Sequence, residues 1–227
     1  MGKVDVIQEK REMMKVLCIT FLFISMGIQA QSTYWDRWDS TVLAAANTAG
    51  NADYMSPEEQ KVVFFMNLAR MDGPLFAETL LQAYVEENNT PNNKYLKSLF
   101  RDLKKLDPLA PLVPAGDLAS IAAGHAEKSG RTGHVGHKDF KKRFEPVMGD
   151  PYTNVGENCS YGYDRAIDIV ISLLIDEGVE NLGHRLNILR PEFNSAGVAI
   201  RDHKSYRYNC VIDFGRNDNS SLNDLPF

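Results

Sequence analysis

The sequence contains 227 residues, of which 44% are hydrophobic and 24% are charged, and its formal net charge is -5. These proportions are ordinary for a globular protein, so we expect one domain with a full hydrophobic core. The chain has no basic run of the nucleic-acid-binding type, and no GxGxxG or P-loop pattern. We therefore expect neither nucleic acid nor nucleotide as a partner.

The first thirty residues differ in composition from the rest of the chain. Basic residues precede the apolar run "VLCITFLFISMGI", and small residues end this segment at Ala30. The run is shorter than the roughly 20 residues that a transmembrane helix needs, and the order of features is typical of a secretory signal peptide. We predict a signal peptide over residues 1–30 and a secreted protein, extracellular or periplasmic, that is not an integral membrane protein. An uncleaved anchor is the alternative.

Helices are predicted mainly in the first two thirds of the chain. After a lead-in segment, residues 31–55, the sequence "SPEEQ" gives a helix start at Ser56, with Ser at the N-cap and Pro at the first helical position. Apolar spacing predicts further helices over residues 75–84 and 116–130. Residues 95–105 indicate a basic amphipathic turn or two. A last, largely buried helix is expected to start at Asp164 and to end at Gly178.

Strand patterns are confined to the second half. The segments "ENCSYGY", "AGVAIR" and "YRYNCVIDFG" show alternating or short β-rich apolar runs, and "DHKS" between the last two fits a hairpin. Helices followed by a small antiparallel sheet predict an α+β layered domain. After signal removal, Cys159 and Cys210 remain, and either a disulfide or two buried free thiols fits this pair.

Several residues could bind a cation or carry acid–base chemistry. Two imidazoles and two carboxylates form a sensible set for a divalent metal or for paired proton transfer. No HExxH or CxxC motif places two of them on one face. No GxSxG elbow or cysteine nucleophile signature is present, so acyl-enzyme chemistry is not supported. The candidates are His134, His137, Glu157, Asp176, Glu177 and His184.

The acids Asp176 and Glu177 lie at the predicted C-terminus of the buried helix. A carboxylate in the last turn of a helix is disfavoured by about 0.3–1 kcal/mol, because that end carries partial negative charge. His184, Arg185 or a metal could compensate it, and a purely structural pairing would suffice. The remaining histidines are assigned to helix packing, for His125, and to the hairpin loop, for His203.

The same motifs carry a family resemblance. The segments "GHVGHKDFKKRF", "NVGENCSYGY", "GHRLNILRPEFNSAGVAI" and "YNCVIDFG" together resemble the CAP superfamily of cysteine-rich secretory, antigen 5 and pathogenesis-related class 1 proteins, in its cysteine-poor bacterial branch. The resemblance covers about residues 56–215. It implies an α-β-α sandwich, with a small central antiparallel sheet flanked by helices, over residues 56–217, followed by a C-terminal tail over residues 218–227.

The resemblance also implies a central cleft lined by two histidines and two acids. Glu157 of "GEN" and His184 of "GHR" match directly. Glu177 fits the second acid best, with Asp176 as the alternative, and His137 fits the other histidine, with His134 as the alternative. The stretch that follows His137 is shorter than is usual in this branch. Such a cleft could hold zinc, or magnesium or calcium through its carboxylates.

Three functions are compatible with such a cleft. The resemblance favours a secreted binding module that recognises a lipid, a glycan or a cell-envelope component. The first alternative is a metal-dependent, peptidase-like hydrolase in which Glu157 or Glu177 is the general base. The second is a polar tetrad that stabilises the fold through hydrogen bonds and binds nothing. Whether the protein is an enzyme is left open by the sequence.

Overall fold

The computed structural model describes residues 34–219. The predicted signal peptide and the end of the predicted tail lie outside these residues. The chain divides between Asp39 and Ser40, and the fold below is that of the part that begins at Ser40. None of the helices in the described part of the chain has the length and apolar character needed to cross a bilayer.

Most of the helical residues lie in the first half of this unit. Its helices are α2 (Ser40–Ala46), α3 (Pro57–Met71), α4 (Gly73–Phe76), the π-helical turn η1 (Ala77–Leu81), α5 (Gln82–Glu87), α6 (Lys94–Lys104) and α7 (Gly116–Thr132), followed by the shorter α8 (Phe140–Phe144), α9 (Ala166–Ile175) and α10 (Gly183–Ile188). The strands are β1 (Val113–Pro114), β2 (Tyr152–Tyr161), β3 (Ser195–His203) and β4 (Arg207–Asn217). The expected helix start at Ser56 is confirmed: its side chain forms a capping box with Glu59.

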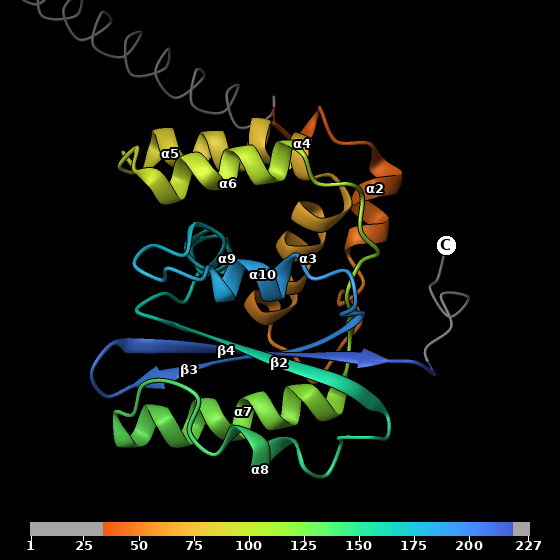
Figure 1. The fold of residues 1–227 in the computed structure, drawn as a ribbon, viewed down its shortest axis with the longest axis vertical. Helices are drawn as coiled ribbons and strands as arrows, with labels where there is room; N and C mark the ends of the chain where they lie inside the picture. The colour runs from red at the N-terminus through yellow and green to blue at the C-terminus, as the bar shows by residue number, and fades with distance from the viewer. Residues whose placement is uncertain (1–33, 220–227) are drawn as a thin grey trace, which may run out of the picture. The chain divides into compact units, whose positions relative to one another are not determined.

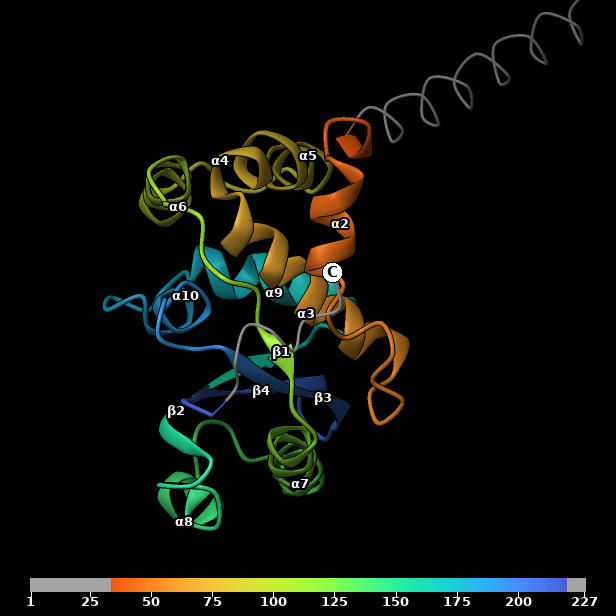
Figure 2. The same ribbon diagram turned by 90° about the vertical axis from the view of Figure 1, so that its right-hand side faces the viewer.

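The four strands form one sheet in the order β1-β3-β4-β2. Strands β3 and β4 form the expected hairpin, β2 pairs antiparallel with β4, and the short β1 lies parallel to β3. Helices α7 and α8 lie on one side of the sheet, and α3, α9 and α10 lie on the other (Figure 1). Helices α4 to α6 form a further layer beyond α3 and α9 (Figure 2). The α-β-α sandwich predicted from the sequence is confirmed.

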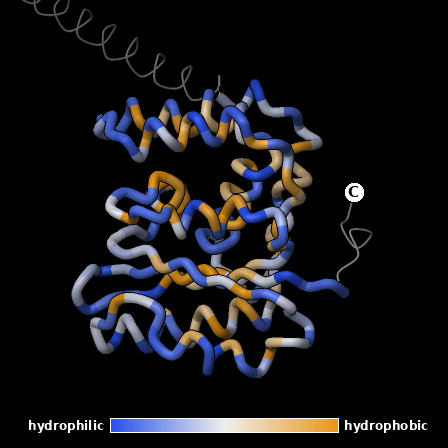
Figure 3. Tube along the Cα trace, viewed as in Figure 1, coloured by the Kyte–Doolittle hydropathy of each residue, from blue (hydrophilic) through white to orange (hydrophobic). Residues whose placement is uncertain are grey.

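Helix α7 packs very closely on the sheet because small residues line the contact. A Cβ atom at Gly197 of β3 would overlap the backbone of Ala119, and one at Gly130 would overlap a carbonyl of β3. Between them lies a cluster of small buried side chains, namely Ala122, Ala126, Cys159, Ala199 and Val211. The apolar residues of α9 and the strands gather in the interior of the domain (Figure 3). This close packing fixes the strands that carry the site.

The two cysteines among the described residues, Cys159 and Cys210, are free thiols. Cys159 of β2 faces α7, where it joins the cluster of small residues. Cys210 of β4 lies opposite Ser160 in the ladder. Since successive side chains of a strand point to opposite faces, Cys210 lies on the other face from Cys159. Both thiols are buried, and this geometry excludes a disulfide between them.

The structure corrects three local expectations. Residues 95–105 were expected to form one or two turns, but residues 95–104 belong to the eleven-residue helix α6, which Asn93 caps through the N–H groups of Tyr95 and Leu96. Helix α9 begins at Ala166 without a side-chain cap from Asp164; the Ala166 N–H donates instead to Glu58. It ends at Ile175, three residues before Gly178.

Candidate functional site

A cleft of about 470 Å³ brings together three of the predicted site residues, His137, Glu157 and His184. His137 lies in the loop after α7, Glu157 lies on β2, and His184 lies in the first turn of α10. The remaining lining residues come from α10 and its flanking loops: Val179, Asn181, Gly183, Leu186, Asn187 and Arg190. Residues distant in sequence therefore meet at the edge strand β2.

His184 is held by Asp176, the acid weighed as the alternative to Glu177. The Nδ1 atom of His184 lies 2.7 Å from Oδ1 of Asp176, and the His184 backbone N–H donates to Oδ2 at 2.9 Å. Asp176 follows α9 in the left-handed conformation, with φ of 56°, and is 3% exposed. This conformation turns its carboxylate back across the loop toward α10.

The structure places Glu177 outside the cleft. Its side chain accepts a hydrogen bond from Asn93 Nδ2 at 2.8 Å, and it lines a separate groove beside α5 and α9. The carbonyl end of α9 is compensated by Arg185, which donates to the carbonyls of Leu174 and Ile175. Two residues therefore compensate the negative C-terminal end of α9: His184 contacts the Asp176 carboxylate, and Arg185 donates to the last carbonyls.

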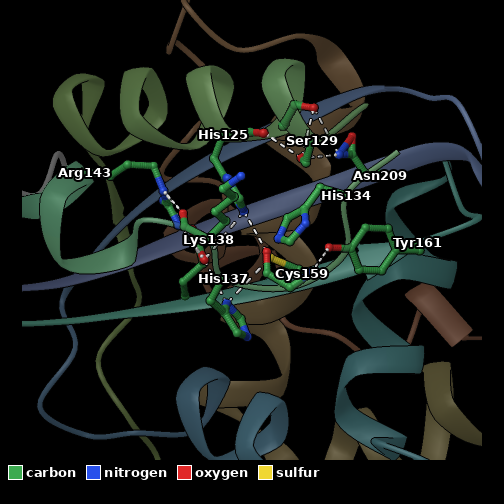
Figure 4. A network of polar contacts seen from close by, with 12 residues as sticks. His125, Ser129, His134, His137, Lys138, Arg143, Cys159, Tyr161 and Asn209 are labelled. Carbon is green, nitrogen blue, oxygen red and sulfur yellow. Dashed lines mark hydrogen bonds and ion pairs between the residues drawn. The ribbon is translucent and has the colours of Figure 1, made fainter. Parts of the chain in front are cut away.

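Glu157 is the most heavily engaged residue of the cleft. Its carboxylate accepts two hydrogen bonds from Arg143, at 2.6 and 2.9 Å, and one from His137 Nδ1 at 2.8 Å. Figure 4 labels the two donor residues, Arg143 and His137. The Glu157 side chain is 1% exposed, whereas that of His137 is 48% exposed. Burial alone would raise the pKa of Glu157, but the hydrogen bonds from His137 and Arg143 outweigh it and hold this pKa well below its ordinary value.

Sequence reasoning missed two partners of Glu157. Arg143, in the run "FKKRF", gave no signal that separated it from its basic neighbours. His125, which was assigned to helix packing, is buried in α7; its Nε2 donates to Gly136 O at 2.9 Å and lies 3.9 Å from Glu157 Oε1. Burial lowers the pKa of His125, although the Glu157 carboxylate opposes the effect. A helical histidine facing the sheet was visible in the sequence, but its partner on β2 was not.

A third missed residue is Asp213, which faces Glu157 across the β2–β4 ladder. It is completely buried, and neither carboxyl oxygen receives a hydrogen bond from a donor among the described residues. Burial, together with the neighbouring Glu157 carboxylate, raises the pKa of Asp213 well above its ordinary value. A protonated Asp213 can donate its O–H to Glu157. Strand alternation in "YNCVIDFG" places Asp213 on the same face as Val211, a signal that the sequence contained.

His134 and His203 occupy positions of a different kind. The His134 side chain lines a second cavity of about 390 Å³, beside α7, together with Lys128, Lys138 and Arg143. His203 was expected in the hairpin loop, but it is the buried last residue of β3 and donates from Nε2 to the His134 carbonyl at 3.0 Å. The structure thus separates His134 from the cleft that contains His137.

One group in the described part of the chain has the composition of a metal site, because ligand atoms of His125, Glu157 and Cys159 all lie within 4.8 Å of one another. Its donors do not suit a cation. The His125 Nε2 proton points at a carbonyl, Glu157 is already neutralised by Arg143, and burial raises the pKa of the Cys159 thiol. These contacts describe a buried polar network.

The histidines of the cleft suit a cation better. In His137 and His184 alike, Nδ1 contacts a carboxylate. A carboxylate oxygen accepts, so Nδ1 carries the proton, and the neutral ring then has its lone pair on Nε2. A carboxylate behind an imidazole is the usual support of a metal-binding histidine, since it fixes both ring orientation and tautomer.

Comparison with known families identifies the family of this chain. Residues 98–214 match the CAP family, described as the cysteine-rich secretory protein family, and the chain belongs to it. The resemblance inferred from the sequence motifs is confirmed. A search of curated proteins finds no match.

Solved structures of similar proteins are distant in sequence. An extracellular protein containing an SCP domain from Bacillus anthracis str. Ames is 16% identical, with a TM-score of 0.45; the match covers 72% of this chain and 44% of that protein. The venom allergen-like protein 4 of Schistosoma mansoni is 13% identical, with a TM-score of 0.45, over 73% and 92% of the two chains. A cysteine-rich secretory protein of Staphylococcus aureus subsp. aureus Mu50 is 19% identical, with a TM-score of 0.37, over 56% and 41%. The chain thus spans less than half the length of the two bacterial proteins.

Proposed function

We propose that this chain is a secreted CAP-domain protein whose cleft binds a divalent cation through Nε2 of His137 and Nε2 of His184. The observation that carries the proposal is the pair of imidazoles in one cleft, each supported at Nδ1 by a buried carboxylate. Imidazole nitrogen suits zinc, and positions not filled by protein would be open to water or to a ligand.

The carboxylates have a positioning role in this proposal. Glu157 orients His137, and Asp176 orients His184, while Arg143 occupies both oxygens of Glu157. Magnesium and calcium prefer several oxygen ligands, which this arrangement does not offer freely. Zinc is therefore the cation that the donor set favours over magnesium or calcium.

Secretion is supported by the N-terminal composition and by the family, which is named for secretory proteins. The proposed processing removes residues 1–30, and the CAP domain extends over residues 56–217. In this setting the cleft recognises a component outside the cell, for which lipid, glycan and envelope components are the candidate classes.

Ligand binding is favoured over hydrolysis by the state of the two acids. A general base must accept a proton at working pH, but the contacts that hold the pKa of Glu157 low make it a weak base. Glu177, the other candidate base, lies in a different groove. The hydrolase hypothesis thus lacks a carboxylate with the required basicity in the cleft.

The test is a zinc titration of the full chain, in competition with a chromogenic chelator. We expect one zinc ion per chain, and we expect binding to be lost in the double variant His137→Ala/His184→Ala. His134→Ala is the matched control, because this histidine lines a different cavity. Equal zinc binding by the double variant, or no binding by the folded wild type, would rule out the proposed site. If the folded wild type bound no zinc and the double variant were less stable than the wild type, a purely structural role of the tetrad would be favoured.

A further inference from the structure

We propose that the ligand of this cleft is a small organic carboxylate bearing an apolar group, and that the Arg190 guanidinium binds the carboxylate. The inference rests on the proposed function of the cleft, because it names the chemical class that the cleft takes. It starts from the charges that line the cleft and from the exposed apolar side chain beside them.

The cleft has one charged side chain left to attract a ligand. Apart from the two histidines, its charged lining residues are Glu157 and Arg190. Glu157 is neutralised by the two-pronged contact with Arg143. Within residues 34–219, no carboxylate lies within the 4.0 Å ion-pair distance of Arg190. In a chain of net charge -5, this cleft therefore favours an anion.

Arg190 is held in a defined place at the cleft. Its guanidinium lies 5.1 Å from the centre of the Phe193 ring, and that ring stacks on Phe214 at 5.5 Å, where both rings are fully buried. Its backbone carbonyl accepts a hydrogen bond from Arg70 at 2.9 Å. Stacking on a fixed ring pre-organises the planar fork of N–H donors. Such a fork matches the two oxygens of a carboxylate.

An apolar contact lies in the same cleft. Leu186 of α10 is 55% exposed, the largest exposed fraction among the exposed large hydrophobic side chains of the described residues, and Val179 lines the cleft from the preceding loop. An exposed leucine beside an unpaired guanidinium fits a ligand that carries both an apolar group and a carboxylate. Two sources offer this chemistry, the C-terminus of a peptide and an aliphatic acid.

The experiment titrates the full chain with three probes, N-acetyl-leucine, hexanoate and N-acetyl-leucinamide, and follows binding by calorimetry in metal-free and zinc-loaded protein. We expect a carboxylate probe to bind and the amide, which lacks the charge, not to bind. Binding of N-acetyl-leucine alone would indicate a peptide C-terminus, and binding of hexanoate alone an aliphatic acid. Arg190→Gln should weaken carboxylate binding at least about tenfold, because a charge-assisted pair of hydrogen bonds is lost.

Arg131→Gln is the matched control, because Arg131 is exposed on α7, outside the cleft, and its replacement removes the same charge. Arg190→Lys retains the charge without the fork and should give intermediate affinity, which keeps the test valid if Arg190→Gln does not fold. Equal carboxylate affinity in wild type and Arg190→Gln, or no binding by the wild type in either metal state, would overturn the inference. Zinc affinity of the wild type, measured separately with the chelator, tests the cation proposal by itself, so failure of the cation proposal is distinguishable from failure of this one.

Discussion

Asp176 and His184 are joined twice, through the imidazole Nδ1 at 2.7 Å and through the backbone N–H at 2.9 Å. One buried carboxylate thus orients the ring and also satisfies a free N–H at the start of α10. Because Asp176 ends α9, this contact connects the two helices on either side of the cleft loop. The helix dipole disfavours the Asp176 carboxylate at the end of α9. His184 stabilises this carboxylate, and the carboxylate in turn fixes the orientation of the His184 ring.

Asp176→Asn should therefore weaken zinc binding by about 10–100-fold, the usual effect of removing a supporting carboxylate. Asparagine tolerates the left-handed conformation of this position, so the fold should persist. Glu177→Gln, one residue further on, should leave the affinity unchanged. The measurement is zinc competition with a chelator, and the opposite ranking of these two variants would show that Glu177 supports the site.

The choice between Asp176 and Glu177 shows how much of the site could be predicted from the sequence. Apolar spacing predicted the buried helix, and the motifs predicted that one of its terminal acids faces His184. Which acid does so depends on where the helix ends, and element boundaries are the least predictable feature of a single sequence. The helix ends at Ile175, and the left-handed turn at Asp176 directs that side chain inward.

The second prediction concerns Glu157, whose pKa is held low by His137 and Arg143 in spite of burial. Glu157→Gln should lower the free energy of unfolding at pH 7 by about 2–4 kcal/mol, because Arg143 would lose its counter-charge. A depressed folded pKa contributes stability above the ordinary value of 4.5, and this contribution is lost as the pH falls below it. The gap between wild type and variant should therefore narrow between pH 7 and pH 3.

Urea unfolding at several pH values measures this gap. Glu127→Gln is the control, because Glu127 is exposed on α7 and its replacement should change stability little. A gap that stayed constant down to pH 3 would mean that the Glu157 charge does not stabilise the fold.

Asp213 should behave in the opposite way. Its folded pKa is raised by burial and by Glu157, so its contribution to stability is full below the ordinary value of 3.8 and is lost as the pH rises. The side chain of Asn in Asp213→Asn has the same shape and an N–H donor toward Glu157. It does not ionise, so it does not lose stability as the pH rises. The variant should gain about 1 kcal/mol or more at pH 7, and the gain should vanish below pH 3.8. Strong destabilisation of Asp213→Asn at pH 7 would indicate an ionised Asp213 with a partner of its own.

The pairing of Glu157 with Asp213 lay beyond sequence reasoning for a physical reason. Alternation indicates which residues share a face of one strand, but the register between strands determines which residues oppose each other. Strands β2 and β4 are separated by two helices and by β3 in the chain, so their register is a property of the folded sheet. Likewise, Arg143 reaches Glu157 only because α8 lies beside the edge strand.

Cys159 and Cys210 provide a prediction about redox state. They lie on opposite faces of adjacent strands, so both should stay reduced in air-exposed protein. Alkylation after unfolding, read by mass spectrometry, should label both thiols, and a reductant should leave the melting temperature unchanged. A mass two units lower, with both sites protected from alkylation, would contradict this pairing of strands.

Arg70 of α3 provides the last prediction, because it holds the segment that follows α10. Its side chain is fully buried and donates to four backbone carbonyls, at 2.7 to 3.0 Å, namely those of Ala110, Ile188, Arg190 and Phe193. Arg70→Met fills a similar volume but leaves these buried acceptors without donors, each at a cost of about 1–3 kcal/mol before relaxation. We expect a loss of about 3–5 kcal/mol in urea unfolding at pH 7, the scale found when one partner of a buried charged contact is removed. Arg131→Met on the surface of α7 should change stability by less than about 0.5 kcal/mol.

The Arg70→Met variant also tests the position of Arg190, because the Arg190 carbonyl is one of the four acceptors of Arg70. A folded Arg70→Met variant should bind carboxylates more weakly than wild type. If the variant and the wild type were equal in stability and in carboxylate binding, the segment after α10 would keep its position without Arg70.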